Sequence, residues 1–518
     1  MQDLVQIQEP QLIGMNDRYP PQALPRGIYT LVQNALVDQD RIQKRKGTTP
    51  VAASIGSFSI LGLSAFQPDA GTKYLIANFD GASNAQLYKW SGSGNFTTLG
   101  SANLTAGASM NFVQASNILY GFNGTDVVSV DSSLTVTKNP ATVPQGNYAS
   151  WFHNYLFVAN SAAHPNRVFW SVLGDPTTFN SSDFIDINPS DGDQITGLAI
   201  LNDELYVFKN NTIWTLTGFS GATFATTAAL GQNTNNKIYG YGSPSQKSIV
   251  STGRDLYYLS FAGGTPHFRS FITTQFSSTI EQGIVSFDVE GTMNGLQASQ
   301  LSKVSGAFDG KYIYWSLPNG GSSTNNLVLV LEPSIKVKGK DMVHRSWVKW
   351  TGFNAAQFAT SSLSGQNTLY FGDSTATGNV SKLNDSLYTD NGVAVSMDIR
   401  SRDYRLDPAK KSKWKYIYFH YLTGVSGTLT INAKIDDAAT YILQQSLSLQ
   451  GNSPGLGPTG TFTLGVSILG GSTIAQNRVP LSKLLGHHLG FQITEATSSS
   501  AEIQNIEVLG KVKGYRKN

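Results

Sequence analysis

The chain of 518 residues contains no cysteine, and only 14% of its residues are charged, against roughly 25% in ordinary soluble domains. The absence of cysteine excludes a disulfide framework, a thiol nucleophile, an iron–sulfur cluster and a Cys-ligated zinc site. The net charge of +3 is small for this length, so no strong overall field favours nucleic acid or a membrane surface. Stability must therefore come from burial and hydrogen bonding.

Long apolar runs and catalytic fingerprints are also missing. No stretch of 18 apolar residues predicts a membrane-spanning helix, and the first residues lack the basic and then apolar pattern of a signal peptide. The sequence contains no GxxxxGK[ST] phosphate loop, HExxH zinc helix or GxSxG elbow, and no strand-turn-helix pattern with GxGxxG. Of the seven histidines, only His487 and His488 are adjacent, and adjacent strand residues point to opposite faces. We therefore expect no metal, no cofactor and no enzymatic activity.

Turn-forming residues, by contrast, are abundant, with 51 glycines and many Ser, Thr and Asn. From residue 55 to 390, a polar turn repeatedly separates two short strands rich in Tyr, Phe and Leu, as in 71–90, 115–131 and 201–218. One hairpin pair cannot bury its own faces, so such repeats predict radially stacked blades. The sequence thus predicts an all-β fold in which residues 55–390 form a β-propeller of about six or seven blades.

Two different segments flank this predicted propeller. Residues 1–54 form a predicted docking segment with one short helix over 27–40. The apolar residues of that stretch follow helical spacing: Ile28, Leu31, Val32 and Leu36. Residues 391–518 contain longer alternating strands separated by turns, a pattern typical of a β-sandwich. We therefore expect an N-terminal helix-containing arm, a propeller and a C-terminal β-sandwich-like domain.

Two basic clusters are candidate docking surfaces for an acidic partner. The first cluster follows the predicted helix and comprises Arg41, Lys44, Arg45 and Lys46. The second comprises Lys411, Lys413 and Lys415, whose alternation on a strand predicts three like charges on one face. The alternatives are a solvated turn for the first cluster and, for the second, an edge strand that lysines protect against aggregation.

One acidic cluster is a candidate sugar or ion site. It comprises Asp183, Asp186, Asp191 and Asp193. Paired carboxylates could serve a glycosidase, and oxygen ligands at alternate positions suit a divalent cation, although the spacing fits no EF-hand. The alternative is a turn in which Asp side chains cap backbone N–H groups, as the neighbouring Pro and Gly suggest.

The start of the sequence resembles that of a group of tailed-phage virion proteins. In that group a Leu-Pro-x-Gly segment precedes a short helix with Asn and then a Lys-Arg-x-Gly-Thr turn. The matching positions here are Leu24, Pro25, Gly27, Asn34, Lys44, Arg45, Gly47 and Thr48. Segments 164–179, 191–218 and 401–436 also look like strands and hairpins of this group.

The group consists of the tail-hub or nozzle proteins of short-tailed phages, also called tail tubular protein B or packaged-DNA stabilisation protein. The resemblance implies a structural virion protein in the phage tail, without membrane insertion. It implies a hexameric ring below the portal and adaptor that makes the DNA channel, retains or conducts double-stranded DNA, and carries fibres or spikes. Because each phosphate neutralised by Lys or Arg adds affinity, we expect hydroxyl and amide groups to line such a channel.

A function of a different class is also compatible with the sequence. The acidic cluster and the eight tryptophans are compatible with a carbohydrate-binding or glycan-cleaving propeller of a phage receptor-binding spike. In that case Trp side chains would stack on sugars, whereas otherwise they fill the cores of blades.

Overall fold

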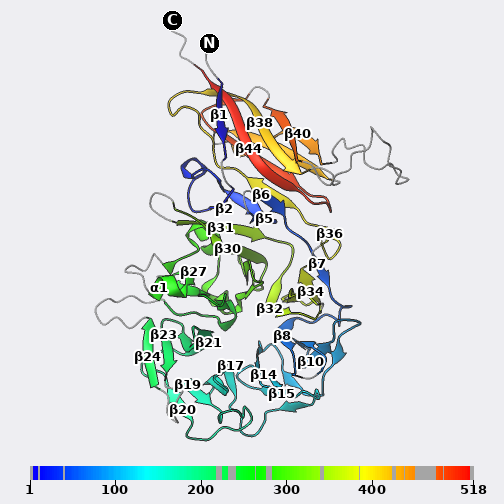
Figure 1. Cartoon of the computed structure of the whole chain (residues 1–518), viewed down its shortest axis with the longest axis vertical. Coiled ribbons are helices and arrows are strands. Elements are labelled where there is room, and N and C mark those ends of the chain that lie inside the picture. The colour runs from blue at the N-terminus through cyan, green and yellow to red at the C-terminus, as the bar shows by residue number, and fades with distance from the viewer. Residues whose placement is uncertain are drawn as a thin grey trace. The chain divides into compact units, whose positions relative to one another are not determined.

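The computed structural model describes residues 4–513 except 10–11, 39–40, 70, 218–224, 231–240, 263, 276–282, 339–342, 364, 384–385, 423–426, 437, 450–473 and 482–483 (Figure 1). The chain forms two compact units. The propeller unit comprises Pro50–Leu329 and Phe353–Leu383, and the sandwich unit comprises Met1–Thr49, Val330–Gly352 and Asn384–Asn518.

Antiparallel sheets of consecutive strands make up the propeller unit. The first is formed by β8 (Ile60–Phe66), β9 (Tyr74–Phe79), β10 (Asn84–Trp90), β11 (Thr97–Thr98) and β12 (Leu104–Thr105). The second is formed by β13 (Asn111–Ala115), β14 (Ile118–Phe122), β15 (Val127–Val130) and β16 (Val136–Lys138). The third is formed by β17 (Gly146–Phe152), β18 (Tyr155–Ser161), β19 (His164–Trp170) and β20 (Phe184–Asp186).

The series continues in the same chain order. The next sheets are formed by β21 (Ile195–Leu201), β22 (Glu204–Lys209), β23 (Ile213–Thr217) and β24 (Ala225–Leu230), and by β25 (Val250–Ser251), β26 (Leu256–Ala262) and β27 (Thr265–Ser270). Then follow β28 (Ser305–Phe308), β29 (Ile313–Leu317) and the start of β30 (Leu327–Lys338), and finally β32 (Ala355–Ser361), β33 (Thr368–Asp373) and β34 (Val380–Leu383). Short helical turns lie between some of them: η2 (Gln246–Ser248), α1 (Phe271–Gln275), η4 (Phe287–Val289), α2 (Glu290–Met293) and η5 (Ala298–Lys303).

The innermost strands of these sheets follow one another around a centre (Figure 1). β8 lies beside β13, β13 beside β17, β17 beside β21, β21 beside β25, β25 beside β28 and β28 beside β32. β32 in turn lies beside β8, which closes the ring. Apolar clusters fill the space between successive sheets; one joins Phe66 and Leu87 to Leu119 and Val130, because neither sheet can bury its faces alone. The predicted all-β propeller of six or seven blades is confirmed.

The sandwich unit contains two facing groups of strands. One has the order β41 (Ile474–Pro480), β38 (Ser412–Leu422), β44 (Glu502–Val512), β6 (Arg41–Lys44) and β5 (Ala35–Asp38), with β1 (Val5–Gln8) on β44 and β42 (Leu485–Gly486) on β38. The other has the order β31 (Val343–Trp350), β4 (Leu31–Gln33), β37 (Met397–Arg400), β43 (Leu489–Glu495), β39 (Thr428–Ile435) and β40 (Ile442–Ser448). Phe419 of β38 meets Phe491 of β43 edge-on, with ring centroids 5.9 Å apart. This contact supports the predicted sandwich-like architecture.

The helix predicted over residues 27–40 is wrong. The structure has strands there: β3 (Ile28–Tyr29), which pairs in parallel with β2 (Gly14–Met15), and then β4 and β5. Asn34 separates β4 from β5 in the left-handed conformation, with φ 54°. Burial alternates along β5, which pairs with β6, because successive side chains of a strand point to opposite faces of the sheet. In the described part of the predicted arm, the only helical element is a short 3-10 turn, η1 (Pro21–Ala23).

The divisions of the chain also differ from the predicted ranges. Residues 1–49 are not a separate arm, because β1 and β6 pair with β44 and β4 pairs with β37. Residues 330–352, predicted to be part of a blade, belong to the sandwich unit, as do the short strands β35 (Thr389–Asp390) and β36 (Val393–Ala394). β7 (Thr48–Pro50) lies at the point where the chain passes from one unit to the other. In the part of the chain that the structure describes, no helix has the length and apolarity to span a membrane.

Candidate functional sites

Asp191 of the acidic cluster is held by a buried lysine. Lys209, at the end of β22, has a fully buried side chain, and its Nζ donates to both carboxylate oxygens of Asp191 at 2.8 Å. The same Nζ donates to the main-chain oxygen of Asn188 at 3.0 Å. An ammonium group thus occupies the position beside Asp191 that a bound cation would take.

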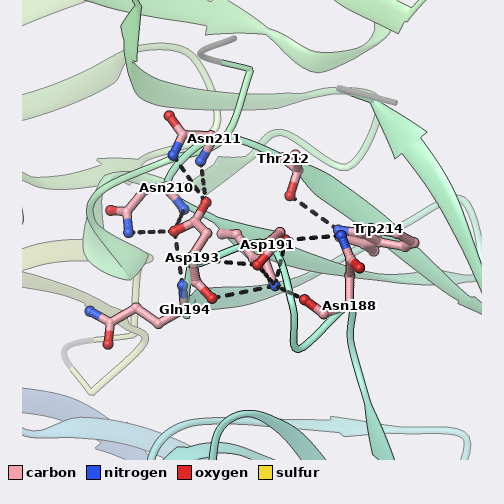
Figure 2. Close-up of polar contacts among 9 residues, drawn as sticks. Asn188, Asp191, Asp193, Gln194, Asn210, Asn211, Thr212 and Trp214 are labelled. Carbon is pink, nitrogen blue, oxygen red and sulfur yellow. Dashed lines mark hydrogen bonds and ion pairs between the residues drawn. The ribbon is translucent and has the colours of Figure 1, made fainter. Parts of the chain in front are cut away.

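Asp193 caps the turn between β22 and β23. Its carboxylate accepts hydrogen bonds from the backbone N–H groups of Gln194 (2.9 Å), Asn210 (3.2 Å) and Asn211 (2.8 Å) (Figure 2). The side-chain amides of Asn210 and Asn211 donate to it as well, at 2.8 and 3.2 Å. A carboxylate offers about four acceptor positions, so Asp193 has little capacity left for a ligand.

The other two carboxylates of the acidic cluster have partners of their own. Arg167 on β19 donates to Asp186 on β20 through Nε and Nη2 at 2.7 and 2.8 Å, and this bidentate contact lowers the pKa of Asp186. Asp183 accepts from the amide of Asn180 at 2.7 Å. Among the described residues no group of three His, Asp or Glu could hold a metal ion. These contacts favour the turn interpretation over the sugar or ion site.

Lys44 of the first basic cluster is buried rather than available for docking. Its side chain is fully buried in the sandwich unit, and Nζ donates to the carboxylate of Glu495 and to the main-chain oxygen of Thr497. Burial lowers the pKa of Lys44, and the hydrogen bond that Lys44 donates to Glu495 opposes that shift. The prediction of a docking role for Lys44 is wrong, because the chain itself neutralises this charge.

Arg45 is likewise an interior residue. Its fully buried guanidinium makes a bidentate contact with Asp390, and Nε donates to Asn34 Oδ1 at 3.0 Å. Nη2 also donates to the main-chain oxygen of Thr351 at 2.6 Å. The docking prediction for Arg45 is wrong for the same reason as for Lys44.

Other positions of the phage-type pattern contact the same network. Asn34 donates through Nδ2 to the main-chain oxygen of Ser396 at 2.7 Å, and Thr48 Oγ1 donates to Asp390 at 3.2 Å. A Cβ at Gly47 would collide with the carbonyl oxygen of Thr389, so only glycine fits. We call Asn34, Lys44, Arg45, Gly47, Thr48 and Asp390 the buried polar network. Sequence reasoning missed Asp390 and Glu495, because no local pattern connects them to Arg45 and Lys44.

The remaining members of the first cluster are engaged at the surface. Arg41, with a side chain 39% exposed, pairs with Asp38 at 3.2 Å and with Glu502 at 3.4 Å. Lys46 Nζ donates to the hydroxyl of Tyr388 at 2.8 Å. Carboxylates thus compensate the charge of Arg41, whereas the neutral hydroxyl of Tyr388 leaves the charge of Lys46 uncompensated.

The second basic cluster does lie at the surface. Lys411 and Lys413 are exposed at the start of β38, while Lys415 sits at a β-bulge, which interrupts the predicted alternation. β38 lies between β41 and β44, so the edge-strand interpretation does not apply. β44 places Lys511 directly opposite Lys413, and Lys513 donates its N–H to the main-chain oxygen of Lys411.

We call Lys411, Lys413, Lys511 and Lys513 the lysine patch. Within the described part of the chain, none of these four side chains forms an ion pair. Like charges directly opposite each other on a sheet are destabilising. The lysine patch is therefore the surface feature of the sandwich unit that an acidic partner would stabilise.

Comparisons with known proteins give similarity in structure only. No family model matches the chain, and no curated protein matches its sequence. Similar solved structures include virginiamycin B lyase from Staphylococcus aureus (11% identity, 65% of this chain and 98% of that chain, TM-score 0.39). They also include the C-terminal WD40 domain of Sif2 (10% identity, 74% of this chain and 98% of that chain, TM-score 0.36) and Kluyveromyces lactis Hsv2 (11% identity, 55% and 83%, TM-score 0.32). Similarities this weak carry no argument about function.

Proposed function

We propose that the chain is a structural protein of a phage tail, a subunit of the nozzle or hub ring through which double-stranded DNA passes. The ring would be a hexamer below the portal and adaptor and would carry fibres or spikes. The observation that supports this proposal is the buried polar network. Five of the positions that carry the phage-type resemblance, from Asn34 to Thr48, make up most of that network in the sandwich unit.

The network explains why those residue types are required. The planar guanidinium of Arg45 donates from Nη1 and Nη2 to the two carboxylate oxygens of Asp390, a bidentate contact that lysine cannot make. Asn34 adopts a left-handed conformation, which Asn tolerates better than most residues, and its amide both accepts from Arg45 and donates to Ser396. A short pattern that coincided with the phage group by chance would not be expected to fall on neighbouring buried residues, among which Arg45 bonds to Asn34 and both Arg45 and Thr48 bond to Asp390.

The carbohydrate alternative has lost one of its two motivating features, the acidic cluster. A glycan-cleaving site needs two carboxyl groups free to flank the scissile bond. Here Asp186 instead binds Arg167, and Asp191 binds Lys209. Asp193 accepts hydrogen bonds from the turn between β22 and β23. We therefore favour the tail protein as the function.

Location is the first test of the proposed function. If the chain is a tail subunit, mass spectrometry of purified phage particles should find it in isolated tails, at a copy number matching a ring. Detection in the host cell but in no particle would contradict the proposal.

The lysine patch is the predicted docking surface toward an acidic face of a neighbouring tail protein. The double substitution Lys413→Glu/Lys511→Glu should weaken incorporation into tails that lack the subunit by at least about tenfold, because attraction becomes repulsion. Co-sedimentation with such tails measures this. Lys311→Glu, at an exposed lysine of the propeller unit, is the matched control and should leave incorporation unchanged.

The same co-sedimentation experiment can reject the role of the lysine patch. Incorporation of the double variant at the wild-type level would show that the partner docks elsewhere. Loss of affinity for free duplex DNA, with normal incorporation, would assign the patch to nucleic acid instead. Circular dichroism of each variant checks that the strands remain folded.

A further inference from the structure

A cavity of about 270 Å³ lies within the propeller unit, against loops and innermost strands from several of its sheets. Six of its fourteen lining residues carry hydroxyl groups: Ser59, Ser109, Ser302, Ser323, Thr324 and Ser374. A water molecule takes about 30 Å³ in the liquid, so the cavity has room for a small polar molecule with several waters. It is too small for a nucleic-acid duplex.

Lys247 extends from η2 into this region. Its Nζ donates to the hydroxyl of Ser109 at 2.5 Å and to the main-chain oxygen of Leu61 at 3.3 Å. Lys247 also lines two further cavities, of about 230 and 190 Å³, so its side chain borders three adjoining spaces. The lysine is thus placed where a molecule entering any of the three would meet it.

The positive charge of Lys247 has no carboxylate partner among the described residues. The other charged groups of the cavity wall are Lys303, whose Nζ donates to the main-chain oxygen of Ser323 at 2.6 Å, and Asp80, which accepts from the N–H of Gly107 at 2.8 Å. The wall therefore carries two cations and one anion. Burial lowers the pKa of Lys247 to about 8, as expected for a partly buried cation without a counter-charge.

We infer that this cavity binds a small oxyanion, a phosphate group that is free or carried by a small molecule, with Lys247 as its cationic contact. Hydroxyl and ammonium donors are the side-chain groups that proteins use to hold phosphate oxygens. The hydroxyl groups of the wall would donate hydrogen bonds to the remaining phosphate oxygens. The anion would supply the negative counter-charge that Lys247 lacks. The inference is independent of the proposed tail function, because it concerns the propeller unit alone.

The first test is calorimetric titration of the full chain with inorganic phosphate, and separately with glycerol phosphate, at constant ionic strength. Binding is expected for the wild type and for Lys311→Met, an exposed lysine outside the cavity wall. Lys247→Met should weaken binding at least about tenfold, since a hydrogen bond to a charged group is worth about 1.5–3 kcal/mol. Tighter binding of the ester would identify a phosphorylated molecule, and tighter binding of inorganic phosphate would identify free phosphate. Absence of binding to both would overturn the inference.

A second measurement uses the unmodified chain, so it does not depend on a variant that folds. Lys247 should be acylated faster at pH 8 than Lys311, because burial lowers its pKa. Phosphate should slow acylation of the peptide that contains Lys247 at least about threefold, relative to chloride at the same ionic strength, because a bound anion favours the charged amine. Mass spectrometry reads the modification of each lysine, with Lys311 as the internal reference. Equal acylation of Lys247 in phosphate and in chloride would contradict the inference.

Discussion

Replacing Asp390 by Asn is expected to lower the free energy of unfolding of the sandwich unit by about 3–5 kcal/mol. Asp390 is the counter-charge of Arg45, whose guanidinium is fully buried. The neutral amide of Asn would leave a buried cation without compensation, and one of its N–H groups would face another donor. Removing one partner of a buried ion pair lowers the free energy of unfolding by far more than the intact pair contributes to it.

Asp186→Asn is the matched control for this substitution. Asp186 makes the same bidentate contact with Arg167, but in that pair the carboxylate side chain is 36% exposed. Water can solvate the remaining charge, so the loss should be about 0–1 kcal/mol. Urea unfolding followed by tryptophan fluorescence and circular dichroism measures both changes. Similar decreases in the free energy of unfolding for the two variants would show that the buried contact between Arg45 and Asp390 does not stabilise the sandwich unit more than an exposed ion pair does.

Asp191→Ala is expected to destabilise the propeller unit by about 3 kcal/mol. The substitution removes both carboxylate acceptors of the buried Lys209 Nζ and leaves it with main-chain oxygens such as that of Asn188. Asp183→Ala, in the same loop region, removes a carboxylate whose contact with Asn180 is exposed to solvent. It should lower the free energy of unfolding by less than about 1 kcal/mol. Thermal unfolding of the two variants provides the measurement.

The same two variants separate a structural from a sugar-binding role of the acidic cluster. Under the structural account, binding to a glycan array is unchanged in any variant that remains folded. If Asp191→Ala left stability intact but abolished binding to a glycan that the wild type recognises, the carbohydrate alternative would be restored.

The propeller could be predicted because its determinants are local. A tight hairpin turn needs residues that adopt positive φ, and Asn202 and Asp203 do so between β21 and β22, with φ 50° and 63°. Each turn and its two apolar strands lie within about twenty residues in the sequence. The repeat therefore indicates blades even without a tertiary structure.

The sandwich unit was harder to predict because its determinants are far apart in the chain. The stretch 27–40 has helical spacing, yet β4 pairs with β37, whose residues lie near the other end of the chain. Lys44 and Arg45 look like surface charges until Glu495 and Asp390 are placed beside them. The β-bulge at Lys415 likewise depends on the register with β44, which no local pattern encodes.

Cryo-electron microscopy of the phage tail tests the central claim most directly. The account predicts a six-fold ring below the adaptor, into which the two units fit as separate bodies, with the lysine patch against an acidic neighbour and DNA passing between subunits. A tail whose rings have density for other chains only, or density for this chain in a peripheral spike that contacts no DNA path, would contradict it.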